Sequence, residues 1–226
     1  SLKVGAYGEY RTRKYVTREF IYNWEPENRG LLPSGFRTMD MTELLSDARY
    51  FGANGLYLLE EPKMTNNYNG NNTLGAGYLA ASLPFGCLSV YAGLRFEYNQ
   101  MELISNTRDD EVSHQSKYYR DRDLFPSVNS TFRINEQHQI RLSYGKSVNR
   151  PEFREVSPSV YYDFDLAANV QGRYDLQSCY IHNVDLRYEF YPSRGEQITL
   201  AGFYKYFDSP IELTYTVSGG TDLIYS

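Results

Sequence analysis

A strict alternation of apolar and polar residues over 88–98 constrains the fold of this chain more than any other feature. Successive side chains of a β-strand point to opposite faces. Leu94 and Phe96 therefore share an apolar face, and Arg95 and Glu97 share a polar one. About 10 residues with this alternation meet the requirements of a tilted strand that crosses a membrane. A strand of a soluble sandwich gives the same local pattern, so the inference depends on repetition.

The alternation returns along the chain. Further strand patterns cover 2–7, 15–22, 73–85, 125–134, 138–148, 181–191 and 197–207. Short turns at 84–86, 135–137 and 192–195 join strands in pairs, whereas the other links are mostly long. Outer-membrane barrels have this asymmetry, because their periplasmic turns are tight and their external loops are long. The sequence therefore favours an all-β, antiparallel up-and-down meander that is part of a large transmembrane β-barrel.

Aromatic side chains form two belts on the predicted apolar face. One belt lies beside the short turns, the other lies toward the long loops, and aliphatic residues fill the middle. The turn-side belt is Phe85, Phe132, Tyr188 and Phe190; the loop-side belt is Phe96, Tyr98, Tyr144, Tyr204 and Tyr206; the middle is Val90, Leu94, Leu142, Val184, Leu186 and Leu200. Such belts are typical of a protein that meets two membrane–water interfaces.

Composition excludes several functional classes. The chain has 226 residues, a net charge of -5 and no apolar run near the ~20 residues of a membrane helix. An acidic chain is a poor partner for nucleic acid. No nucleophile motif or phosphate loop occurs, the three histidines are scattered, and Cys87 and Cys179 have no framework spacing. We therefore predict no enzymatic activity, no metal site and no cofactor.

The long links are polar. We expect a long extracellular loop over about 23–72, with a short helix over about 41–49 that Asp40 caps and Glu43 supports. Two more polar segments cover 105–123 and about 149–178. The acidic run 109–111 in the first of them is interpreted as solvated rather than as a Ca²⁺ site, because it has no EF-hand spacing.

Several segments resemble the barrel of TonB-dependent outer-membrane receptors, most closely those of Bacteroidetes-type bacteria. The most specific is Asn-Arg-Pro-Glu-Phe-Arg-Glu at 149–155. The others are 71–78, 93–98, 123–127, 142–148, 161–164, 182–193 and 203–212. The resemblance covers most of the chain outside 23–63.

The resemblance implies a nutrient receptor of the bacterial outer membrane. Such a receptor has a 22-stranded barrel, an N-terminal plug in its lumen and a short box that TonB grips. Its external loops bind a siderophore, a cobalamin or a glycan, and TonB supplies the energy for import. This sequence shows only eight or nine strand patterns and no plug or TonB box, so we expect residues 1–226 to be the central part of the barrel. Its partners would be outer-membrane lipid, the plug of the same protein, the TonB complex and an iron chelate or glycan ligand, but no nucleic acid.

Two groups of candidate site residues follow. The polar strand faces would line the lumen, where their charges contact the plug or substrate, or simply form ion pairs across strands. These residues are Arg95, Glu97, Arg133, Arg141, Asp185, Arg187, Glu189 and Lys205. The second long link carries candidates for extracellular ligand contact, with loop anchoring and self-packing as the alternatives. These are Arg150, Arg154, Tyr161, Tyr162, Phe164 and Tyr174.

Two other architectures remain open from the sequence. One is a complete small outer-membrane barrel with a structural or adhesive role. The other is a soluble β-barrel that binds a small ligand, which would place Leu94, Leu142 and Leu186 inside and the neighbouring arginines outside. The position of these leucines distinguishes the soluble barrel from the membrane barrel.

Overall fold

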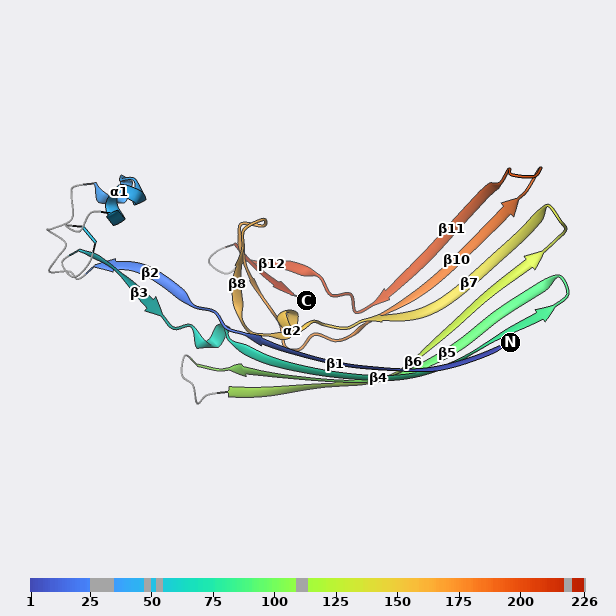
Figure 1. Cartoon of the computed structure of the whole chain (residues 1–226), viewed down its shortest axis with the longest axis horizontal. Helices are drawn as coiled ribbons and strands as arrows, with labels where there is room; N and C mark the ends of the chain where they lie inside the picture. The colour runs from blue at the N-terminus through green and yellow to red at the C-terminus, as the bar shows by residue number, and fades with distance from the viewer. Residues whose placement is uncertain (25–34, 47–49, 52–54, 109–113, 218–220, 226) are drawn as a thin grey trace.

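A single curved antiparallel sheet contains most of the chain (Figure 1). The computed structural model describes residues 1–24, 35–46, 50–51, 55–108, 114–217 and 221–225. The seven strands of the large sheet follow one another in the order β1 (Leu2–Tyr15), β4 (Tyr68–Phe85), β5 (Leu88–Asn106), β6 (His114–Arg133), β7 (His138–Asn149), β10 (Cys179–Phe190) and β11 (Ile198–Asp208). Neighbours in this sheet are therefore neighbours in the sequence, apart from the insertions, which confirms the predicted meander.

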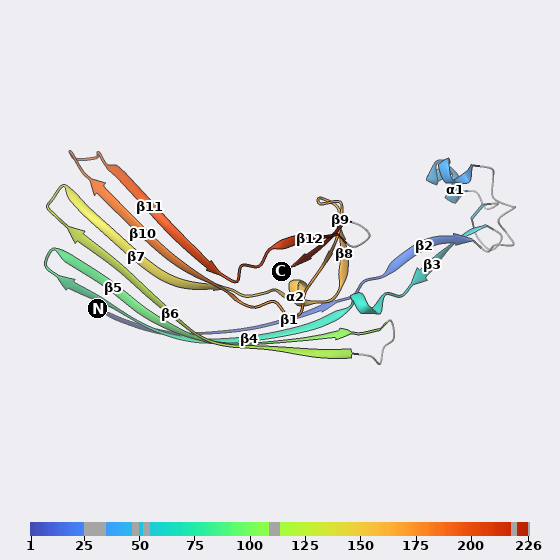
Figure 2. The ribbon, with the colours of Figure 1, turned by 180° about the vertical axis from the view of Figure 1, so that it is seen from behind.

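Smaller elements extend from the loop end of the sheet (Figure 2). They are the pair β2 (Glu19–Trp24) and β3 (Leu56–Glu61), the four-stranded sheet of β8 (Val160–Asp163), β9 (Ala168–Gln171), β12 (Leu213–Val217) and β13 (Thr221–Tyr225), and the short helices η2 (Phe36–Thr38), α1 (Met41–Ser46), η3 (Met64–Asn66) and α2 (Phe153–Val156). The short turns lie together at the opposite end of the sheet (Figure 1). No described helix has the length and apolar character needed to cross a bilayer.

The strands are longer than the sequence patterns predict. The expected loop 23–72 contains β3 and the first residues of β4, and the expected polar link 105–123 is largely the beginning of β6. The described residues form thirteen strands, of which seven build the large sheet, where the sequence shows eight or nine strand patterns. The beginning of β6 has polar residues on both faces, and β3 has apolar residues on both faces, so neither shows the hydrophobic alternation that reveals a strand.

The helix expected over about 41–49 runs from Met41 to Ser46, and positions 47–49 lie outside the described residues, as does the acidic run 109–111. Asp40 caps α1 by accepting the backbone N–H of Thr42 at 2.8 Å. The hydrogen bonds that the Asp40 carboxylate accepts from Thr42 and Glu43 lower the pKa of Asp40. In a small core, Leu44 packs with Leu56, and Trp24 lies against both.

The strand register divides the sheet into two faces. Arg95 lies opposite Phe125, and Glu97 lies opposite Asp123, so one face runs continuously across β5 and β6. Helix α2 and the four-stranded sheet lie on the concave side (Figure 1). Phe153 of α2 packs on this side, so the face of Arg95 is the concave face.

The convex face carries every residue of the two predicted aromatic belts and of the aliphatic middle. Leu94, Leu142 and Leu186 are 48%, 50% and 53% exposed there. A soluble barrel would bury these leucines in its interior, so that alternative is wrong. In the described residues β1 and β11 lie at opposite edges and do not pair, so the sheet does not close into a small barrel.

Candidate functional site

A buried guanidinium is the centre of a charged cluster on the concave face. Arg150 donates to Glu97 at 2.7 Å and to Asp123 at 2.8 Å, and its Nε lies 3.4 Å from Asp121. Tyr180 donates to the same Asp123 at 2.7 Å. The cluster therefore joins β5, β6 and the beginning of β10 to the segment that follows β7.

Charge balance explains how this cluster tolerates burial. Arg150 is 16% exposed, and burial alone would lower its pKa. The carboxylates of Glu97 and Asp123 more than offset burial, so the pKa of Arg150 is raised. The guanidinium consequently stays charged at every physiological pH. A second cation, Arg95, lies 2.6 Å from Glu97 and adds to the balance.

The separation of β7 from β6 puts Arg150 at this position. The two strands pair only as far as Ser127 and Gly145, while β7 continues beside β10 to Asn149. Beyond Gly145 the β7–β10 pair therefore rises over the concave face. Arg150 then points from the end of β7 toward the acidic residues of the sheet below.

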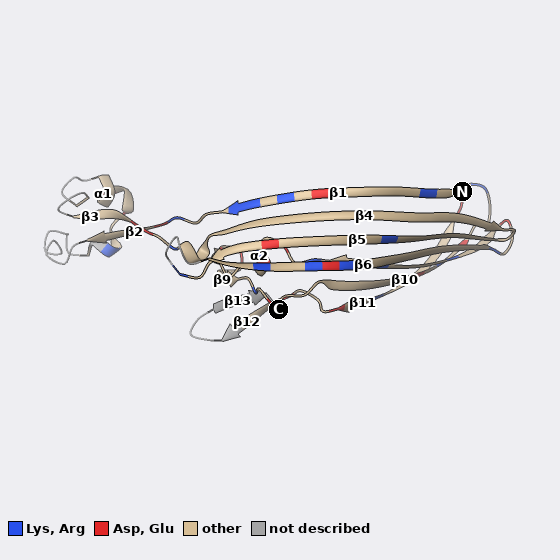
Figure 3. Ribbon diagram, turned by 90° about the horizontal axis from the view of Figure 1, so that it is seen from below, with Lys and Arg blue, Asp and Glu red and all other residues tan. Residues whose placement is uncertain are grey.

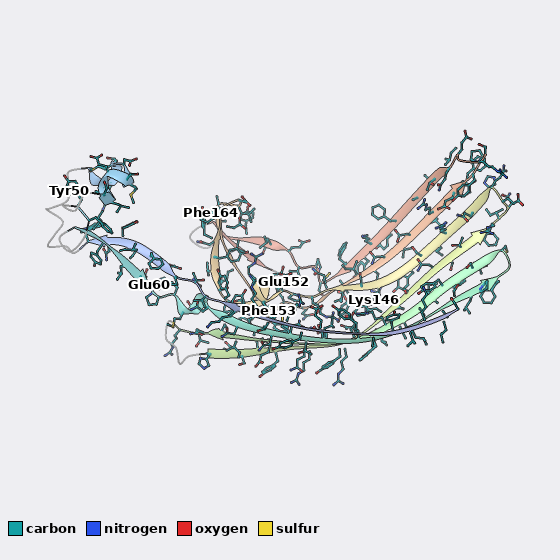
Figure 4. All side chains as sticks on the ribbon, in the orientation of Figure 1. Tyr50, Glu60, Lys146, Glu152, Phe153 and Phe164 are labelled. Atoms are coloured by element: carbon teal, nitrogen blue, oxygen red, sulfur yellow. The ribbon has the colours of Figure 1, made fainter. Side chains whose placement is uncertain are left out.

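Helix α2 continues this inward fold. Glu152 and Glu155 form a reciprocal capping box at its first turn. Phe153 and Val156 then pack on Leu103 and Met101 in the largest apolar cluster of the described residues (Figure 4). The apolar contacts and the charged cluster together hold residues 150–156 on the concave face.

A cavity lies between this segment and the loop-side ends of β5 and β6. Its volume is about 380 Å³. The wall combines apolar groups with amides, hydroxyls and one ammonium group; it includes Leu103, Val156, Gln115, Gln171, Ser105, Lys117 and Tyr174. A pocket of this size can take a small ligand with both polar and apolar surfaces.

Lys117 and Tyr174 line the basic end of the cavity, and Tyr119 contacts both of them from outside its wall. The Lys117 ammonium lies 5.7 Å from the ring centre of Tyr174 and 5.9 Å from that of Tyr119. The Tyr119 hydroxyl donates a hydrogen bond to the Tyr174 carbonyl. Burial raises the pKa of Tyr119 to about 12, so this hydroxyl is protonated at neutral pH. This end of the cavity thus offers an ammonium group and aromatic faces to an anionic or planar ligand.

All eight predicted strand-face charges share the concave face. The structure brings Arg141 and Arg187 to within 3.4 Å and 2.8 Å of Glu189, which is 1% exposed. Arg95 and Glu97 belong to the Arg150 cluster. Ion pairing between neighbours thus accounts for five of the eight predicted residues, Arg95, Glu97, Arg141, Arg187 and Glu189.

The remaining three have other surroundings. Asp185 accepts a hydrogen bond from Ser143 at 3.3 Å. Arg133 and Lys205 are exposed, and neither has an ion pair within the described part of the chain.

The six predicted loop residues do not gather at one place. Arg150 is the buried anchor described above, and Arg154 stacks on Tyr161 at 4.9 Å. Tyr162 and Phe164 make an edge contact with ring centres 5.0 Å apart, and Phe164 is 87% exposed at the turn between β8 and β9 (Figure 4). Tyr174 lies at the cavity instead.

Sequence reasoning missed the contribution of β6. Lys117, Tyr119, Asp121 and Asp123 alternate on the concave face, but this stretch was expected to be a polar loop. Residues on the two faces of this stretch differ in charge but not in hydrophobicity. The concave face has the two aspartates, and the opposite face has Tyr118 and two arginines. A test for alternating charge and aromatic character would have found the strand. In the described residues no group of three His, Cys, Asp or Glu side chains could hold a metal ion.

Comparisons with known proteins agree with this architecture. A sequence model described as the outer membrane protein beta-barrel family matches residues 8–226. No curated protein matches the chain. Among solved structures, the hemophore receptor HasR of Serratia marcescens, as a double mutant with the hemophore HasA and heme, is similar with a TM-score of 0.52 and 10% identity. That match covers 99% of this chain and 36% of HasR, and it shows a shared fold.

Two Pseudomonas aeruginosa structures are similar at lower scores. The siderophore receptor PirA matches with a TM-score of 0.48 and 13% identity, over 70% of this chain and 37% of PirA. The ferric enterobactin receptor PfeA, as a mutant, matches with a TM-score of 0.47 and 14% identity, over 98% of this chain and 36% of PfeA. The chain thus spans 36 to 37% of the length of these three proteins.

Proposed function

Since the chain belongs to the outer membrane protein beta-barrel family, we propose that it forms part of the barrel wall of a nutrient receptor. The bacterial outer membrane is its location. The receptor binds a scarce nutrient of the siderophore, cobalamin or glycan class and imports it with energy from TonB. We propose that the protein comes from a Bacteroidetes-type bacterium, because its sequence most closely resembles the receptors of that group.

The division of the sheet into two faces carries this proposal. Its convex face exposes an aliphatic band between two aromatic belts, as lipid contact requires. Its concave face carries ion pairs and a segment that folds inward, as a filled lumen requires. Seven strands are roughly a third of a 22-stranded barrel of the plugged type, which agrees with a chain that spans 36% of HasR.

The concave charges have proposed partners beyond the wall. Arg133, Asp185 and Lys205 have no ion pair in the described residues, so they are available to the plug or to the substrate path. Arg95, Glu97, Arg141, Arg187 and Glu189 serve the wall itself. The TonB complex acts through parts of the protein other than these residues.

The inward fold supplies the proposed ligand contacts. Tyr162 and Phe164 present exposed rings that can stack on a sugar or on an aromatic iron chelator. Lys117 and Tyr174 present a cation and a ring at the cavity. Arg154 stabilises the fold by stacking on Tyr161 and lies near this surface, whereas Arg150 anchors it.

Uptake by the full receptor in its own host tests the function. A strain without the gene should lose uptake of one of three probes: a ferric siderophore, cyanocobalamin or an oligosaccharide. Restoring the gene should restore uptake, and a protonophore should abolish it, because TonB draws on the proton gradient. Unchanged uptake of all three probes in the deletion strain would overturn the proposal.

A double substitution tests the ligand surface. Tyr162→Ala with Phe164→Ala should weaken binding of the imported probe about tenfold or more, because stacked aromatic pairs are each worth about 0.5–1.5 kcal/mol. The matched control is Phe20→Ala, which removes an exposed aromatic from β2. Equal affinities in the double variant and the control would remove these two rings from the site.

A further inference from the structure

Two arginines of β6 lie on the convex face, directly beyond the end of its apolar band. Phe132, Val128 and Leu124 of β6 point outward along the apolar band, and Leu124 is 53% exposed. The next outward positions along the strand are Arg122 and Arg120, and both are exposed. Figure 3 shows charged residues on β6 in the half away from the short turns.

Strand length places these arginines at a membrane surface. The stretch 124–133 contains 10 residues, counted from the turn end of β6. A tilted strand needs 9–11 residues to cross the apolar part of a bilayer. Arg122 and Arg120 therefore begin where the hydrocarbon ends, at the level of the headgroups on the loop side.

Neighbouring rings hold the two guanidinium groups against the outer surface. Arg122 lies opposite Tyr98 and 5.8 Å from its ring centre. Arg120 lies 5.8 Å from the ring centre of Tyr118. Neither arginine has a carboxylate partner in the described residues. The acid on this face, Glu102, lies one row farther from the apolar band and accepts a hydrogen bond from Tyr118.

We propose that Arg120 and Arg122 form a binding site for the phosphate groups of an anionic glycolipid in the outer leaflet. Side chains two positions apart on a strand face are about 6.5–7 Å apart, so they can bind two oxygens of one phosphate or two neighbouring phosphates. Guanidinium groups bind phosphate bidentately, and this geometry favours Arg over Lys. The adjoining aliphatic band holds the acyl chains of the same lipid. The proposal depends on the outward orientation of the convex face, which the proposed function also requires.

Binding of lipid A to the purified full receptor in detergent tests the site. The probe is bisphosphorylated lipid A, and native mass spectrometry measures its affinity. Basic residues at a membrane surface contribute about 1 kcal/mol each, so R120Q/R122Q should weaken binding about 30-fold. Each single variant should weaken binding about fivefold, which keeps the test valid if the double variant does not fold. R194Q, in a short turn at the opposite end, should bind as the wild type does.

Three results would overturn the site. The double variant could retain wild-type affinity, or the wild type could bind dephosphorylated lipid A equally well, which would leave only apolar contact. Competition by 10 mM inorganic phosphate would assign the site to free phosphate instead of lipid.

The uptake experiment separates this site from the proposed function. Normal lipid A binding in a receptor that imports none of the three probes would overturn the receptor and retain the site. Normal uptake by R120Q/R122Q, together with the expected loss of lipid A binding, would support both.

Discussion

The turn-side half and the loop-side half of the large sheet differ in what their outer faces meet. Near the short turns, the convex face is aliphatic and aromatic, and the concave face is charged. Toward the loops, beyond Leu124 and Phe96, the convex face of β5 and β6 becomes mostly polar, and the concave face combines the charged cluster with the buried Met101 and Leu103. The ladder between the two strands nevertheless continues from Phe96 to Asn106 without a break. Backbone pairing is therefore independent of the hydrophobic pattern. The hydrophobic alternation indicates what a strand contacts on each face, and a strand can form without it.

The first test of the difference between the two halves places a charge in the middle of the apolar band on the convex face. Leu142→Arg should destabilise the barrel by about 2–4 kcal/mol, because an arginine at the bilayer midplane has that cost. The same new residue on the same face of the loop-side half, in Gln100→Arg, should change stability by less than about 1 kcal/mol. Denaturant unfolding of the full-length barrel protein from lipid vesicles measures both. Equal costs would mean that the convex face does not meet hydrocarbon.

The second change removes the cation of the buried cluster. Arg150→Met should cost about 2–3 kcal/mol, because Glu97 and Asp123 lose a charged hydrogen-bond donor. The loss should concentrate in residues 150–156, which hydrogen exchange can resolve. The control is Arg154→Met, which loses one ring contact and should cost about 1 kcal/mol or less. Faster exchange in the control than in Arg150→Met would contradict the anchoring role.

The third change compares two glycines of one strand. A Cβ at Gly70 would overlap the ring of Phe153, whereas a Cβ at Gly75 on the convex face would meet nothing within 4 Å. Gly70→Ala should therefore displace α2 and cost about 1–3 kcal/mol. Gly75→Ala should be close to neutral. Hydrogen exchange over α2 in the two variants provides the measurement, and equal protection would show that α2 does not pack closely on β4.

The smallest expected effect is a response to alkali of Tyr119, whose hydroxyl contacts the cavity residue Tyr174. The pKa of Tyr119 is raised by burial from 10.0 to about 12, so its neutral form is favoured in the folded state. Its contribution to stability is complete below pH 10 and is lost as the pH rises through 12. Absorbance of tyrosinate near 295 nm should show a group of tyrosines that titrate late, because the pKa values of Tyr68 and Tyr180 are raised as well. Tyr119→Phe should reduce the amplitude of this late phase by one tyrosine. A titration that is the same in both proteins would contradict the burial of this hydroxyl.

The sequence predicted the turn-side half well because Leu94, Leu142 and Leu186 alternate with charges. It also predicted the cap of α1 by Asp40, since the carboxylate accepts backbone N–H groups within one turn. The concave partners Asp121 and Asp123 could not be predicted in the same way, because their strand has polar residues on both faces. The position of Arg150 depends on the separation of β7 from β6 after Gly145, and this separation follows from packing across the sheet rather than from any local pattern.

The Arg150 cluster has a consequence for the order of folding. Its members come from two separate strand pairs, β5–β6 and β7–β10, so both pairs must form before Arg150 can contact its carboxylates. We therefore expect this contact to form late in folding. Contacts that are absent from the folding transition state change the unfolding rate rather than the folding rate. Loss of this arginine should thus shorten the lifetime of the finished wall and leave the speed of its insertion unchanged.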